Sequence, residues 1–133
     1  MHSTRGNAST PENEFRGTLN WFSNPNASVS AHIVIAHDGR IAECVDPALQ
    51  AWHARAENAR RLGIELCQSR PGDHITDAQL RSAAWWLKRM SERFGFPLTA
   101  EALPEHRHTP SGIQDGKSDV GADYSFERLA RFF

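Results

Sequence analysis

The sequence is poor in cysteine, in tyrosine and in net charge. Its 133 residues include two cysteines and one tyrosine, and 15 Lys+Arg against 16 Asp+Glu leave a formal net charge of −1. Two cysteines are too few for a disulfide scaffold. The near-neutral charge argues against a protein that binds nucleic acid by bulk electrostatics. Together with a hydrophobic share of 39%, it also argues against intrinsic disorder.

Long apolar runs are absent as well. No stretch approaches the roughly 18 apolar residues of a membrane helix, so we expect no membrane insertion. Residues 1–5 do not begin a secretory signal, which predicts synthesis in the cytoplasm without a signal peptide. The length and the lack of repeats predict that residues 1–133 form a single domain. Its seven histidines are the chemically informative feature.

The first half of the chain changes from a helical to an extended pattern. Thr10-Pro11-Glu12 is typical of a helix start, and the apolar stripe that follows ends before Asn24-Pro25. A period of two over residues 29–36 predicts a strand. Asp38-Gly39 then predicts a tight turn, and residues 40–45 predict the returning strand of a hairpin.

The second half adds one strand and the longest helix. Residues 62–67 form a brief apolar run that predicts a central strand, and Thr76 to Gln79 fits a capping box before a helix that ends near Gly95. This alternation predicts a small α/β domain. Loops are expected at residues 1–9, 46–58 (with a short helical turn), 69–73 and 99–122, and a short helix at residues 125–133.

Several candidate metal ligands fall in segments predicted as loops. Zinc needs nitrogen, sulfur or carboxylate ligands that converge in space, and His2, His106, His108 and Asp119 are of these types. Their spacing matches no short ligand motif such as H-E-x-x-H. Each histidine taken singly is therefore also compatible with an ordinary hydrogen-bonded or surface residue.

Two charged residues stand out from their surroundings. Glu65 interrupts an apolar strand, where a carboxylate is either buried for a function or points to a solvated face of the sheet. Lys117 lies in a Gly-Lys-Ser-Asp-Val-Gly loop, where it is either a solvated charge or a group that stabilises an oxyanion. Cys44 and Cys67 are interpreted as small core residues, and a disulfide is the alternative.

Five motifs follow one another along the chain. They are His2-Ser3-Thr4-Arg5-Gly6, the hairpin from Val29 to Ile41, Ala51-Trp52-His53-Ala54 with Asn58, Leu62-Gly63-Ile64-Glu65-Leu66, and Lys117-Ser118-Asp119-Val120-Gly121. In type and order they resemble the motifs of the zinc-dependent N-acetylmuramoyl-L-alanine amidases of type 2, the family that includes peptidoglycan recognition proteins. The resemblance covers nearly the whole chain. It implies a small mixed central β-sheet flanked by helices.

The resemblance also implies roles for individual residues. The zinc ligands fall on His2, His106 and Asp119. The catalytic glutamate falls on Glu65 and the catalytic lysine on Lys117. Substrate-groove residues fall on Trp52, His53 and Asn58, although packing beneath the loop is the alternative for Trp52 and His53. Some relatives place a tyrosine at the position of Ala31, which carries no proton-transfer group, so proton transfer is expected from Glu65.

Two positions depart from the family pattern. The family has a strand before the first zinc histidine, whereas only Met1 precedes His2. We therefore expect either that the chain starts downstream of the true start or that the fold omits this strand. In both cases the N-terminal segment should be mobile and the zinc site weaker than in relatives that have the strand. The second ligand is open between His106 and His108. We favour His106, because His106-Arg107 resembles the family's H-R pair.

The function implied by the resemblance is hydrolysis of the amide between N-acetylmuramic acid and L-alanine in bacterial peptidoglycan or muropeptides. A monomeric phage endolysin that acts on the cell wall, or a stand-alone bacterial amidase, is the expected setting. A recognition module without catalysis is the alternative from the binding class. The third possibility is a wall-associated protein in which zinc only holds loops together.

Overall fold

A four-stranded sheet with the strand order β1-β4-β2-β3 forms the centre of the protein. The structure is a computed structural model that describes residues 1–133. Strand β4 pairs in parallel with β1 and β2, and β3 pairs antiparallel with β2. The sheet is therefore mixed, as expected. The strands are β1 (His2–Ser3), β2 (Ile33–Ile35), β3 (Ile41–Glu43) and β4 (Ile64–Leu66).

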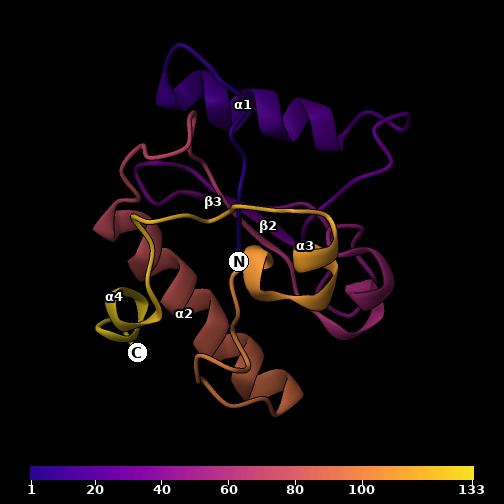
Figure 1. Ribbon diagram of the computed structural model, residues 1–133, viewed down its shortest axis with the longest axis vertical. Coiled ribbons are helices and arrows are strands. Elements are labelled where there is room, and N and C mark those ends of the chain that lie inside the picture. Colours follow the sequence, from indigo (N-terminus) through magenta and orange to yellow (C-terminus); the bar gives the residue numbers. More distant parts are fainter.

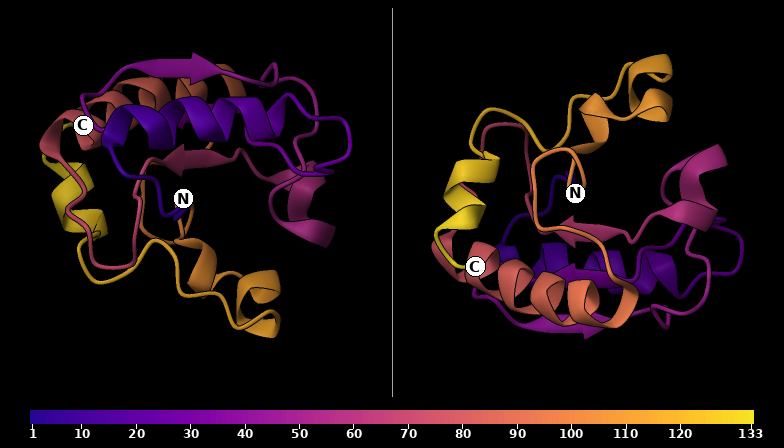
Figure 2. Two further views of the ribbon diagram at one scale, coloured as in Figure 1. Left: turned by 90° about the horizontal axis from the view of Figure 1, so that it is seen from above. Right: turned by 90° about the horizontal axis from the view of Figure 1, so that it is seen from below.

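Helices α1 (Pro11–Phe22) and α2 (Asp77–Phe94) cover opposite faces of this sheet (Figures 1 and 2). Successive side chains of a strand point to opposite faces. Accordingly, Ile33 and Ile35 belong to the larger apolar cluster with α2, whereas Val34 packs with Phe15 of α1. The predicted α/β fold is confirmed. The shorter helical segments are η1 (Arg55–Arg60), η2 (His106–His108), α3 (Pro110–Gln114) and α4 (Phe126–Ala130).

Local capping chemistry places the ends of both long helices where the sequence predicts them. The Thr10 hydroxyl accepts a hydrogen bond from the Asn13 N–H at the start of α1. Thr76 and Gln79 form a reciprocal capping box at the start of α2. Gly95 ends α2 with φ 73°, in the left-handed region that favours glycine.

The N-terminal segment corrects one expectation. Residues 1–9 were predicted as a loop, but His2 and Ser3 form β1 and pair with Glu65 and Leu66 of β4. His2 is therefore held by the sheet itself, so the expectation of a poorly held first ligand is wrong. A strand of two residues is too short to produce a recognisable period. Its partner β4 also lies some sixty positions away, so local patterns carry no sign of the pairing.

Other differences are smaller. The strands expected at residues 29–36 and 62–67 shorten to three residues each, and the loop expected at 99–122 contains η2 and α3. Cys67 is buried as predicted, but Cys44 is exposed, so its assignment to the core is wrong; both thiols are free. None of the helices combines the length and the apolar character needed to cross a bilayer.

Candidate functional site

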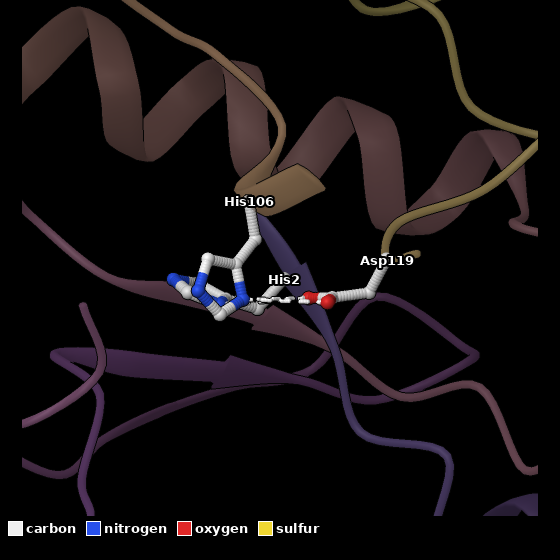
Figure 3. A group of neighbouring side chains, drawn as sticks. All are labelled: His2, His106 and Asp119. Atoms are coloured by element: carbon white, nitrogen blue, oxygen red, sulfur yellow. Dashed lines mark hydrogen bonds and ion pairs between the residues drawn. The ribbon is translucent and has the colours of Figure 1, made fainter. Parts of the chain in front are cut away.

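Three side chains from distant parts of the chain meet at the edge of the sheet. His2 lies on β1, His106 begins η2, and Asp119 lies in the loop after α3. Their candidate ligand atoms all lie within 4.8 Å of one another, and each residue is at most 8% exposed. Figure 3 shows both imidazole rings beside the Asp119 carboxylate. The structure thus brings together the three residues that the resemblance marks as metal ligands.

The protonation states of His2 and Asp119 suit a cation. Burial lowers the pKa of His2 to about 3, so its imidazole is neutral. Burial opposes ionisation of Asp119, but the interactions with the His106 and His2 imidazoles together outweigh it and hold the pKa of this carboxyl well below its ordinary range. Neutral imidazoles and a carboxylate are the forms of these side chains that bind metals. The Nδ1 atoms of His106 and His2 lie 3.3 Å and 3.6 Å from the Asp119 carboxylate.

His53 lies behind His2, on the side away from Asp119. Its Nδ1 is 3.0 Å from His2 Nε2, and its Nε2 is 3.1 Å from the carbonyl oxygen of Arg61. Burial lowers the pKa of His53 to about 4. The Asn58 side-chain oxygen accepts hydrogen bonds from the backbone N–H groups of His53 and Ala54, and so fixes this loop.

A cavity of about 590 Å³ is lined by two of the three candidate ligands, His2 and His106. It lies at the amino ends of the parallel strands, and its apolar lining comes mainly from residues 47–49, from α2 and from the segment before η2. His53 and Asn58, which the resemblance marks for substrate contact, line it. Trp52 is 54% exposed, which excludes the alternative that it packs beneath the loop. The lining includes His2, His53, Asn58, Phe96, Leu103 and His106.

Glu65 occupies the middle of β4, directly opposite His2. Its Oε2 atom is buried and has no hydrogen-bond partner. Burial, reinforced by the negative charge of Asp119, raises the pKa of Glu65 to about 8. Glu65 as a whole is half-buried, and its covered, unpaired Oε2 favours the interpretation of a carboxylate kept for a function over that of a solvated one. A carboxyl with a covered oxygen and a raised pKa beside a cluster of candidate ligands has the properties of a proton-transfer group.

Comparison with known proteins identifies the family of this chain. Residues 2–122 match the family described as N-acetylmuramoyl-L-alanine amidase. The chain belongs to this family. N-acetylmuramoyl-L-alanine amidase A of Achromobacter lyticus is 46% identical over 57 residues, which are 42% of this chain. The chain spans only 32% of the length of that relative.

A solved structure supports the fold of this amidase-family chain. The crystal structure of a selenomethionine derivative of AmpD superposes with a TM-score of 0.65 and covers 98% of this chain and 80% of the other. The two sequences are 21% identical, so the likeness concerns the fold. The resemblance inferred from the five motifs is confirmed.

Lys117 lies in the loop that also carries Asp119. Its side chain is exposed, and its positive charge slightly opposes the raised pKa of Glu65. Arg5 binds this loop: its Nη1 donates to Ser118 Oγ at 2.6 Å, and its Nη2 donates to the carbonyl oxygens of Ser118 and Val120 at 3.0 and 2.9 Å. Arg5 thereby connects the segment after His2 to the Asp119 loop. The sequence analysis did not predict this role, because the only signal was one arginine within a motif that is weak by itself.

His108, the alternative to His106, lies outside the group of candidate ligands. Its side chain is 61% exposed, and its Nδ1 faces Glu105 at 3.7 Å. His106 and His108 stand at the two ends of the short helix η2, and only His106 is buried. The geometry supports the preference for His106.

Proposed function

We propose that this chain hydrolyses the amide bond between N-acetylmuramic acid and L-alanine in peptidoglycan, with a zinc ion held by His2, His106 and Asp119. One observation carries the proposal: a buried group of two imidazoles and a carboxylate lies beside a glutamate whose Oε2 is buried and unpaired, in a chain of the amidase family. Three protein ligands leave a fourth zinc position for water or substrate.

The residues present suit zinc on chemical grounds. His2 Nδ1 and Asp119 Oδ2 face each other at 3.6 Å, and a cation between them would satisfy both. The donor set of two nitrogens and one carboxylate is typical of catalytic zinc. Zinc bound there would polarise the scissile carbonyl and lower the pKa of a bound water.

Glu65 and Lys117 would supply the proton transfer and the charge stabilisation. Glu65 accepts a proton from the attacking water and passes it to the leaving amide nitrogen. A cation at the three ligands would favour the ionised form of Glu65 and prepare it as a base. The Lys117 ammonium group stabilises the negative charge that develops on the carbonyl oxygen.

Substrate binding is assigned to the cavity beside the ligands. His53 and Asn58 line the cavity wall, and Trp52, outside that lining, exposes an indole that can pack on a sugar ring. The substrate would be intact peptidoglycan or soluble muropeptides, bound by a monomer. Action on the cell wall as a phage endolysin, after synthesis in the cytoplasm without a signal peptide, is the setting that we favour.

The experiment that tests this function combines metal analysis with a product assay. We expect one zinc per chain and release of free stem peptide from purified sacculi, both abolished by a strong chelator and restored by added zinc. Turnover that is unaffected by chelation would contradict the proposal. Zinc without turnover would support the alternative in which the metal only holds loops together. Binding to sacculi without zinc or turnover would support a recognition module.

A further inference from the structure

We propose that His53 is a positioning residue that fixes the tautomer of His2, so that the Nδ1 lone pair of His2 faces Asp119 and is ready to bind a metal. This inference rests on the proposed metal centre. It assigns His53 a role besides contact with substrate. A ligating histidine usually donates its other ring N–H to a carboxylate, a backbone carbonyl or water. Here the acceptor is a second imidazole.

The direction of each hydrogen bond follows from one fixed point, the backbone carbonyl of Arg61. A carbonyl oxygen only accepts, so the His53 Nε2 that lies 3.1 Å from it must carry the hydrogen. In a neutral imidazole the other nitrogen then has a free lone pair, which places the acceptor at His53 Nδ1.

The same logic extends to the first candidate ligand. His53 Nδ1 lies 3.0 Å from His2 Nε2, so His2 Nε2 must donate the hydrogen. The lone pair of His2 is then on Nδ1, the atom that lies 3.6 Å from Asp119 Oδ2. The reverse direction would turn a lone pair of His53 toward the lone pairs of the Arg61 carbonyl.

The surroundings of His53 hold its ring in this orientation. The absence of a side chain at Gly63 makes room for it, because a Cβ there would lie 2.7 Å from ring atoms of His53. Asn58 binds the backbone N–H of His53 at 3.0 Å. The rings of His2 and His32 pack edge-on against it, with centroids 5.1 and 5.8 Å away.

A neutral acceptor has a chemical consequence. A carboxylate behind His2 would add a second negative charge to the site, whereas His53 passes the hydrogen bond to a backbone carbonyl and adds none. Asp119 therefore remains the one anionic residue among the three ligands. A divalent cation bound there would keep more of its positive charge for polarising a substrate.

The first test reads the tautomers directly in the metal-free wild-type protein. Long-range nitrogen–proton correlation spectra of ¹⁵N-labelled protein distinguish the two tautomers of each histidine. We expect hydrogen on Nε2 and none on Nδ1 in both His2 and His53. A His2 ring with hydrogen on Nδ1 would overturn the proposal. This measurement needs no variant, no zinc and no turnover, so it is decided separately from the proposed function.

The second test measures zinc affinity by competition with a chelator. His53→Phe keeps an aromatic ring and removes the acceptor, and we expect zinc binding to weaken by roughly 10- to 100-fold. His53→Gln keeps an acceptor oxygen and should recover part of that loss. His108→Gln changes an exposed histidine outside the group and should stay within about 2-fold of wild type.

Equal zinc affinity in wild type and a folded His53→Phe variant would overturn the proposal, as would equal losses in the Phe and Gln variants. If the variants fail to fold, the tautomer measurement on the wild type still decides. If the wild-type protein binds no zinc, the proposed function fails, and the tautomer spectra alone test His53.

Discussion

His2 and Glu65 are direct register partners on the neighbouring parallel strands β1 and β4. Paired residues on adjacent strands project to the same face of a sheet, so the strand pairing sets the separation between the first candidate metal ligand and the candidate base. Strand β1 consists of two residues, and this pairing is what holds His2 in place.

Glu65→Gln tests the role of Glu65 in proton transfer. The amide keeps the size of the side chain but can neither accept nor donate the proton, so we expect turnover on sacculi to fall by roughly two to four orders of magnitude. Zinc content should not change, because Glu65 is not among the three ligands. A variant with a near wild-type rate would show that another residue transfers the proton. Loss of zinc in the variant would show that Glu65 is a metal ligand.

The same substitution predicts a pH-dependent change in stability. The pKa of Glu65 is raised in the folded protein to about 8 from 4.5, so the folded state binds more protons than the unfolded state, and its stability falls as pH rises through this window. Gln resembles the protonated acid. The metal-free variant should therefore match the wild type near pH 5 and exceed its free energy of unfolding by on the order of a few kcal/mol near pH 8.

Denaturant titrations of both proteins with chelator present check this prediction. The difference in unfolding free energy between the two proteins reports on Glu65 alone, because groups whose stability contribution changes with pH in the opposite direction are present in both. Burial lowers the pKa values of His2 and His53 to about 3 and about 4, so their contribution to stability is lost as pH falls from 6.5. Parallel pH profiles for variant and wild type would contradict the raised pKa.

Zinc should stabilise the folded chain through His106 and not through His108. A ligand that binds only the folded state adds about 2.7 kcal/mol at one hundred times its dissociation constant, and the melting temperature should rise accordingly. His106→Ala and Asp119→Asn should abolish this rise, whereas His108→Ala should keep it. Thermal melts with and without zinc provide the measurement. Loss of the rise in His108→Ala alone would show that the ligand choice is wrong.

Arg5→Gln should loosen the Asp119 loop. The substitution removes three hydrogen bonds to Ser118 and Val120, and we expect the free energy of unfolding to fall by about 1–3 kcal/mol. Zinc affinity should fall as well, because the loop carries one ligand. Arg16→Gln, at an exposed position on α1, is the matched control. Equal effects of the two substitutions on zinc affinity would rule out the positioning role of Arg5.

Gly63→Ala should disturb the ring of His53. The added Cβ would lie 2.7 Å from ring atoms, which forces the imidazole away from His2 and should cost about 1–3 kcal/mol of stability. Gly17→Ala is the control, because a Cβ at that position in α1 has nothing within 4 Å. It should stabilise the protein by about 0.5–1 kcal/mol. Urea titrations give both values, and a Gly63→Ala variant as stable as wild type would refute the steric argument.

Local chemistry made much of this fold predictable from the sequence. The caps at Thr10 and Thr76 depend on residues within one helical turn, so the sequence alone places both helix starts. The period of two around Val34 predicts a strand, and the structure shows that this strand packs on both faces. The five motifs identify the family and, through it, name the three candidate ligands.

Features that depend on distant contacts required the tertiary structure. Strand β1 exists only because β4 offers backbone partners to two residues far away in the sequence. The surroundings of Glu65 could not be read from its own strand, because the same pattern of residues suits a solvated or a covered face.

The division between the two sources of information has a physical reason. The sequence by itself determined the elements governed by near neighbours and the chemical types of the candidate ligands. Only the tertiary structure decided that His2, His106 and Asp119 converge within 4.8 Å, that the Oε2 atom of Glu65 is buried near them, and that His53 lies behind His2. These are contacts between residues far apart in the chain, and burial and hydrogen-bond direction depend on what the whole fold places around each group.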